Sequence, residues 1–125
     1  MTRRAAVARI ALAAALLLPP APAAPHASLV RSSPASRAIV ATSPLRVDLW
    51  FSERLESAYS TVSVWNVDGQ RVDRMDVLVG PDDPKRLSVG MFTLRPGAYT
   101  VRYRVLSVDG HVIDSSFTFT VRLGA

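Results

Sequence analysis

A strict alternation of apolar and polar residues near the C-terminus constrains the fold of this 125-residue chain more than any other feature. From Tyr99 to Val105 every second position is an aromatic residue or valine, and the positions between them hold Thr100, Arg102 and Arg104. Successive side chains of a β-strand point to opposite faces, so a period of two places all the apolar groups on one face. The segment therefore predicts a strand with one buried face and one face in water.

The same alternation recurs in other segments, at 47–51, 61–67 and 117–121, and a shorter strand is expected at 87–92. Asp68 and Gly69 favour the positive backbone dihedrals of a tight hairpin turn, so the chain is expected to return as a strand over 70–77. Two prolines and two aspartates predict a loop at 80–84. Strand signals spaced in this way, without a helical period beyond the N-terminal region, predict an all-β sandwich or barrel.

The segment Leu94-Arg95-Pro96-Gly97-Ala98-Tyr99 resembles the tyrosine corner of Greek-key sandwiches. In that corner a tyrosine at a strand start hydrogen-bonds back to the backbone a few residues upstream. An ordinary turn before a core tyrosine is the alternative. Either arrangement bears on the fold and not on the function.

The first 23 residues are predicted to be a secretory signal peptide. Arg3 and Arg4 precede nine consecutive apolar residues at 10–18, and Pro19 and Pro20 follow them. This run is too short for a spanning helix, which needs roughly 20 residues. A small-x-small site at 21–23 predicts cleavage before Ala24, leaving residues 24–125 as a single exported domain. An uncleaved N-terminal anchor is the alternative.

Charge and cysteine content exclude several function classes. The chain has 15 Lys and Arg against 10 Asp and Glu, but the predicted leader carries three of the arginines, Arg3, Arg4 and Arg9. The balance left in the domain argues against a nucleic-acid partner. No cysteine is present, which excludes disulfides, thiolate zinc sites and blue-copper sites. Two histidines, His26 and His111, are too few for a three-histidine zinc site.

The two histidines stand in two short motifs. His26 opens the sequence His-Ala-Ser-Leu-Val-Arg-Ser-Ser-Pro-Ala, and His111 ends Ser-Val-Asp-Gly-His after the strand that follows the tyrosine corner. In an extended or turning backbone, Asp109 and His111 can point the same way and share one ion. Taken alone, Asp-Gly-His is more often a plain turn, the role expected of Asp68-Gly69.

Taken together, the motifs resemble the CopC family of periplasmic copper-binding proteins. One part of the resemblance is His-Ala-x-Leu-x-x-Ser-x-Pro-Ala from His26. The other is Leu-x-Pro-Gly-x-Tyr followed by Ser-x-Asp-Gly-His and Phe-x-Phe, while 52–92 matches only in strand pattern. The resemblance implies a seven-stranded Greek-key β-barrel or sandwich, cupredoxin-like or immunoglobulin-like. It also implies one Cu(II) per chain, held by His26, Asp109 and His111.

The resemblance further implies a monomeric, non-enzymatic copper carrier or buffer in the periplasm, active in copper resistance or homeostasis. Such a carrier would pass copper to a CopD-like inner-membrane transporter. Imidazole nitrogens with one carboxylate oxygen suit Cu(II), whereas Met75 and Met91 are too scattered to build a thioether site for Cu(I). In the family pattern this histidine is the first residue of the mature chain. Pro25 departs from that pattern, because His26 becomes the first residue only if Ala24 and Pro25 are removed after export.

Two other classes remain open from the sequence. A scaffolding or adhesion sandwich would use Asp109-Gly110 only as a turn. An oxidative copper enzyme would need an open coordination position and a broad aromatic face, and neither is indicated. Trp50 and Trp65 point away from the apolar residues of their strands, and we expect one in the core and the other half-buried.

Overall fold

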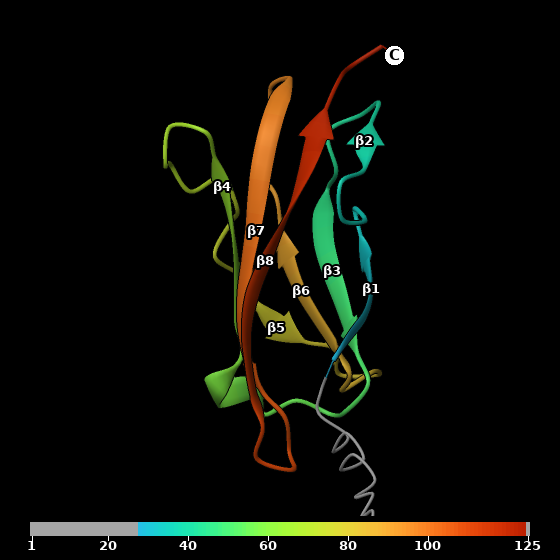
Figure 1. Ribbon diagram of the computed structural model, residues 1–125, viewed down its shortest axis with the longest axis vertical. Coiled ribbons are helices and arrows are strands. Elements are labelled where there is room, and N and C mark those ends of the chain that lie inside the picture. The colour runs from blue at the N-terminus through green and yellow to red at the C-terminus, as the bar shows by residue number, and fades with distance from the viewer. Residues whose placement is uncertain (1–27, 125) are drawn as a thin grey trace, which may run out of the picture.

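The computed structural model describes residues 28–124, so the predicted leader and His26 lie outside the described residues. Within them the chain forms two four-stranded sheets, one ordered β1-β3-β6-β5 and the other β2-β8-β7-β4 (Figure 1). The strands have the following bounds: β1 Leu29–Ser33, β2 Ile39–Val40, β3 Arg46–Phe51, β4 Thr61–Asn66, β5 Leu78–Val79, β6 Arg86–Gly90, β7 Gly97–Leu106 and β8 Val112–Val121. A single 3-10 turn, η1 at Ser57–Tyr59, precedes β4. All pairings are antiparallel except that of β2 with β8.

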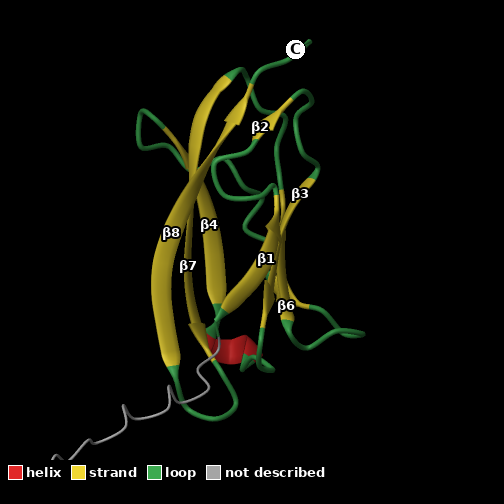
Figure 2. Ribbon diagram, turned by 45° about the vertical axis from the view of Figure 1, so that its right-hand side comes forward, coloured by secondary structure: helices red, strands yellow, loops and turns green. Residues whose placement is uncertain are grey.

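The two sheets lie face to face as separate layers, and the core fills the space between them (Figure 2). The period-two residues of the long strands supply this core. They are Val47, Leu49, Phe51, Val62, Val64, Leu87, Val89, Tyr99, Val101, Tyr103, Val105, Phe117, Phe119 and Val121. The predicted all-β sandwich is therefore confirmed. The described residues form eight strands, against the seven that the family resemblance implies, and two of the eight, β2 and β5, are only two residues long.

The strand expected over 70–77 does not form as a regular strand, and that prediction was wrong. Arg71 and Asp73 make only isolated bridges, to Trp65 and to Met91. Asp73 interrupts the ladder because its carboxylate accepts the Val64 N–H at 2.9 Å, in the place of a backbone carbonyl. The backbone then turns at Met75, whose φ is 62°.

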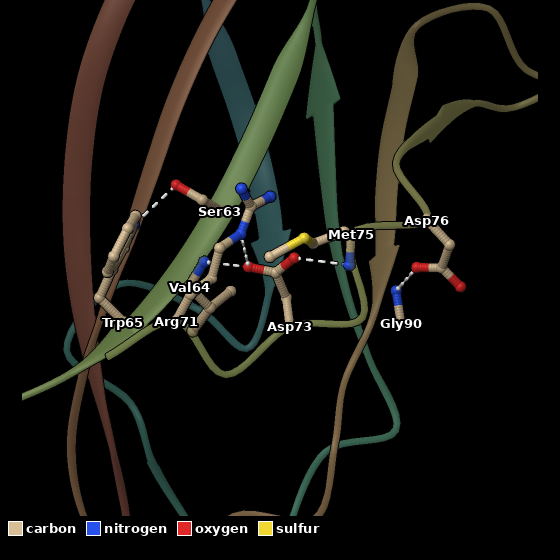
Figure 3. Close-up of polar contacts among 8 residues, drawn as sticks. All are labelled: Ser63, Val64, Trp65, Arg71, Asp73, Met75, Asp76 and Gly90. Atoms are coloured by element: carbon tan, nitrogen blue, oxygen red, sulfur yellow. Dashed lines mark hydrogen bonds and ion pairs between the residues drawn. The ribbon is translucent and has the colours of Figure 1, made fainter. Parts of the chain in front are cut away.

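Asp73 is the buried centre of this segment (Figure 3). Besides the Val64 N–H, its carboxylate accepts Arg71 Nε at 2.8 Å and the Met75 N–H at 2.8 Å. Burial alone raises the pKa of Asp73, but the hydrogen bonds from Arg71, Val64 and Met75 outweigh it and hold the pKa below its ordinary value. The carboxylate thus closes the free edge of β4, where an unpaired N–H would invite pairing with another chain.

The tyrosine corner is present. Tyr99 is buried, and its hydroxyl donates to the Arg95 carbonyl at 2.6 Å, as the Leu-x-Pro-Gly-x-Tyr spacing predicts. The bond ties the start of β7 to the turn that leads into it. It lies at the end of β7 opposite to the Asp109-Gly110-His111 loop (Figure 1).

We expect Tyr99→Phe to lower the free energy of unfolding by about 1 kcal/mol, because one hydrogen bond is lost while the ring stays packed. Urea denaturation measures this change. Tyr59→Phe is the matched control, since Tyr59 is 69% exposed and should change stability by less than about 0.5 kcal/mol. Equal stability of the Tyr99→Phe and parent proteins would show that Tyr99 stabilises the fold by packing alone and not by its hydrogen bond.

Both tryptophans lie half-buried on outer sheet faces, so the expectation of one core tryptophan was wrong. The Arg31 guanidinium carbon stands 3.6 Å from the centroid of the Trp50 ring, and that of Arg102 stands 5.4 Å from the Trp65 ring. Trp65 Nε1 also donates to Ser63 Oγ at 2.8 Å (Figure 3). Each indole therefore covers its sheet and is itself covered by an arginine.

Candidate metal centre

The loop that joins β7 to β8 holds two of the three predicted ligands, Asp109 and His111. It is a tight turn: the Gly110 N–H donates to the Ser107 carbonyl and the Ser107 N–H to the His111 carbonyl, both at 2.9 Å. Gly110 has a φ of 92°, which L side chains adopt at a cost, so a glycine between the two candidate ligands suits this turn. The backbone thus presents positions 109 and 111 at the end of the hairpin.

The two side chains lie together. Asp109 Oδ1 is 3.2 Å from His111 Nδ1, and both side chains are partly exposed, at 36% and 39%. One carboxylate and one imidazole in contact are the donors that a shared ion needs, and imidazole suits copper, zinc and nickel alike. Their exposure leaves room for a further ligand from another part of the chain.

Ser107 holds Asp109 in place. Its hydroxyl donates to Asp109 Oδ1 and accepts the His111 N–H at 3.2 Å, and Ser107 itself is 1% exposed. The hydrogen bond from Ser107, followed by that from His111, holds the pKa of Asp109 below its ordinary value. Asp109 is therefore a carboxylate at neutral pH, the form that binds a cation.

The loop is anchored to the segment that follows β3. Leu55 and Ser107 form a bridge, and the Val108 N–H donates to the Arg54 carbonyl at 2.9 Å. The start of β1 is tied to the same segment, since the Ser52 N–H donates to the Ser28 carbonyl and the Ser28 N–H to Ser52 Oγ, both at 2.9 Å. Residues 52–55 therefore bring the beginning of the described chain and the Asp-Gly-His loop to one end of the sandwich (Figure 1).

This anchoring bears on His26, which lies outside the described residues. Only Ala27 stands between His26 and Ser28 in the sequence, and two residues of extended chain span at most about 7 Å. Within residues 28–124 no group of three metal-ligating side chains occurs, so the described part of the site is the pair Asp109 and His111. The third predicted ligand, His26, is not among the described residues.

Reasoning from the sequence missed the part played by Ser107. The spacing Ser-x-Asp was visible, but a serine two residues before an aspartate is common in turns. What distinguishes Ser107 is its burial against Leu55, a contact between positions far apart in the chain. No signal in the sequence alone identifies that contact.

The whole sandwich is similar to known proteins. The CopC domain family model matches residues 29–122. Protein YobA of Escherichia coli K12 is 34% identical over 98 residues, which cover 78% of this chain and 79% of that protein. Copper resistance protein C of Pseudomonas syringae pv. tomato is 32% identical over 119 residues, covering 90% of this chain and 94% of that protein.

A solved structure shares the fold. The crystal structure of CopC from Methylosinus trichosporium OB3b superposes with a TM-score of 0.74 at 36% sequence identity. The match covers 80% of this chain and 97% of that one. The residues that the CopC domain family model matches, 29–122, include both sheets and the loop that carries Asp109 and His111.

Proposed function

The chain belongs to the CopC family, and from this premise we propose that it holds one Cu(II) ion in the periplasm and passes it on unchanged. A copper-related function and a non-enzymatic role follow from the family itself. The oxidation state, the stoichiometry, the ligands, the export and the recipient are the proposed parts. One observation carries the proposal: Asp109 and His111 are in contact on a loop of a CopC domain.

The proposed ligands are His26, Asp109 and His111. Two imidazoles and a carboxylate suit Cu(II), which also stands at the top of the affinity order for divalent metals. Asp109 supplies a negative charge, and its lowered pKa keeps that charge available to mildly acidic pH. Ser107 keeps the carboxylate oriented without being a ligand itself.

The proposed role is that of a carrier rather than of a redox centre. A site at the end of the sandwich, on side chains that are partly exposed, is open to a recipient that approaches from outside. The proposed recipient is a CopD-like copper transporter of the inner membrane. Residues 1–23 are proposed as the signal peptide that exports the domain 24–125, which we propose is a monomer. No helix among residues 28–124 is long and apolar enough to cross a membrane.

We expect a titration of the exported protein to show one tight Cu(II) per chain and no specific Cu(I) site. Met91 is buried and Met75 is exposed, so the thioethers do not converge with the histidines on one soft site. Competition against a Cu(II) chelator and, separately, against a Cu(I) chelator measures both. A second tight site that fills with Cu(I) would contradict the single-site proposal.

The N-terminal residue should control affinity. A chain that starts at His26 offers its α-amine and imidazole together, whereas a chain that starts at Ala24 leaves His26 with its imidazole alone. Pro25 has no N–H that could be deprotonated to replace the lost nitrogen. We expect the chain that begins at His26 to bind Cu(II) at least about tenfold more tightly, or about 1.4 kcal/mol.

The two chains are compared in competition with the same chelator. Their thermal unfolding without metal is the control, since a terminal extension of two residues should leave the fold unchanged. Indistinguishable affinities would show that the amine is not a ligand and that the coordination differs from the one proposed.

A further inference from the structure

The outer face of the β1-β3-β6-β5 sheet carries a surface that the copper site does not use. We call it the arginine face and define it by Arg31, Arg46, Arg74, Trp50 and Phe92. The register places these residues side by side: Arg31 opposite Trp50, and Arg46 opposite Gly90, whose carbonyl accepts the Arg74 N–H. The Arg74 guanidinium carbon stands 4.6 Å from the centroid of the Phe92 ring.

Each of the three guanidinium groups is held by uncharged neighbours. Arg46 donates through Nε and Nη2 to the buried hydroxyl of Ser88, at 3.0 and 2.8 Å. Arg74 donates from Nε to the Met91 carbonyl at 3.2 Å, and Arg31 stacks on Trp50. Part of the rotamer entropy that an arginine loses on binding is therefore already lost in this fold.

Their positive charges are not neutralised by ion pairs. In the described part of the chain no carboxylate lies within 4.0 Å of Arg31, Arg46 or Arg74. Arg86 on the same face provides the contrast, since it lies 3.9 Å from Asp48 and 3.7 Å from Asp82. Arginine presents several N–H donors that match a carboxylate in a bidentate pair, so these three groups are ready to receive one each.

Apolar side chains are interleaved with the arginines. Phe92 is 50% exposed and packs under Arg74, and Leu78, opposite Ser88 at the sheet edge, is 41% exposed. Arginine and aromatic residues are among the types enriched in the centre of protein interfaces. The composition of the face therefore fits a protein partner with both carboxylates and apolar groups.

We propose that the arginine face docks an extended acidic segment of a partner protein. Arg46 and Trp50 are four residues apart on β3, which at about 3.3 Å per residue is about 13 Å. An extended segment repeats at the same spacing, so glutamates four residues apart would meet Arg46 and the Arg31 that stacks on Trp50. The residue between them would lie over Asp48 and Ser88, the outward pair midway between Arg46 and Trp50, so a serine that donates to the Asp48 carboxylate suits that place.

A second copy of this chain is a poorer partner. The sequence has more basic than acidic residues, so two copies repel one another on average. Asp48 and Asp76 also lie on this face, and Asp76 already accepts the Gly90 N–H at 2.7 Å (Figure 3). These carboxylates disfavour a continuous anionic surface such as a lipid bilayer and favour separate, spaced charges.

The test uses the exported protein and a labelled peptide of repeating Glu-Thr-Ser-Thr, with a Gln-Thr-Ser-Thr peptide as control. Fluorescence anisotropy at low salt measures binding to the parent and to the triple variant Arg31→Gln, Arg46→Gln, Arg74→Gln. The matched control removes equal charge from β7 and from the residue that follows β8, by Arg102→Gln, Arg104→Gln and Arg122→Gln. Copper titration of each variant verifies that the metal site is intact.

We expect the parent to bind the glutamate peptide and not the glutamine peptide. The triple variant should lose at least about tenfold in affinity and the control triple less than about twofold. Arg31→Gln alone, which removes only a surface stacking contact, should lose about threefold and remain folded. Equal losses in both triples, no peptide binding by the parent, or binding to phosphatidylglycerol vesicles instead of the peptide would each overturn the proposal.

Discussion

Replacing His111 by alanine should weaken Cu(II) binding by at least about a hundredfold while the fold stays intact. His111 would be one of only two imidazole ligands, and loss of a ligand costs more than the about ten- to a hundredfold of losing a group that only orients one. Its side chain is 39% exposed on a loop, so it contributes little packing. The change in the free energy of unfolding should be below about 0.5 kcal/mol.

The measurement is a competition titration against a chromophoric Cu(II) chelator. Val112→Ala is the matched control, since Val112 is the next residue, is 52% exposed and offers no ligand atom. The control should bind copper as the parent does. Equal affinity of the His111→Ala and parent proteins for Cu(II) would show that the Asp109-Gly110-His111 loop is a turn without a role in copper binding.

Replacing Asp73 by alanine should lower the free energy of unfolding by about 3–5 kcal/mol, which is a large part of the stability of a small domain. The change leaves the N–H of buried Val64 without its acceptor and removes the ion pair with Arg71. Asp76→Ala is the matched control, because Asp76 is exposed and accepts a single N–H, from Gly90. It should cost only about 1 kcal/mol.

The same carboxylate should govern part of the acid sensitivity of the metal-free protein. The pKa of Asp73 in the fold lies below the ordinary value of 3.8, so its contribution to stability is complete above that value and is lost as the pH falls further. Asp73→Asn should remove this part of the dependence. Urea unfolding of parent and variant at a series of pH values from about 7 to about 3 measures it. Parallel pH profiles would contradict the assignment.

The long strands could be predicted from the sequence because one of their faces is buried and the other is wet. In β7 and β8 this asymmetry fixes the period of two directly. The short strands β2 and β5 carry no such period, and the strand expected over 70–77 rests only on the Asp68-Gly69 turn before it. There the carboxylate of buried Asp73 accepts the N–H that a backbone carbonyl would accept in a regular strand. Strand propensities of the residues cannot reveal such a replacement.

The candidate site, too, could be predicted from the sequence only in part. The spacing of Asp109 and His111 predicts that they can point the same way, and the structure places them in contact. The burial of Ser107 and the anchoring of Ser28 depend on contacts with residues 52–55, which lie far from both in the sequence. Sequence motifs thus indicate which side chains are chemically suited to a metal, and tertiary contacts decide whether they are held together.

Native mass spectrometry of the exported protein, loaded with Cu(II) and freed of excess metal, tests the central claim most directly. It measures the first residue and the copper content in one spectrum. We predict a single species that begins at His26 and retains one copper, and a His111→Ala protein that retains none. A parent protein that emerges without metal, or a variant that keeps its copper as the parent does, would contradict a site built on His26, Asp109 and His111.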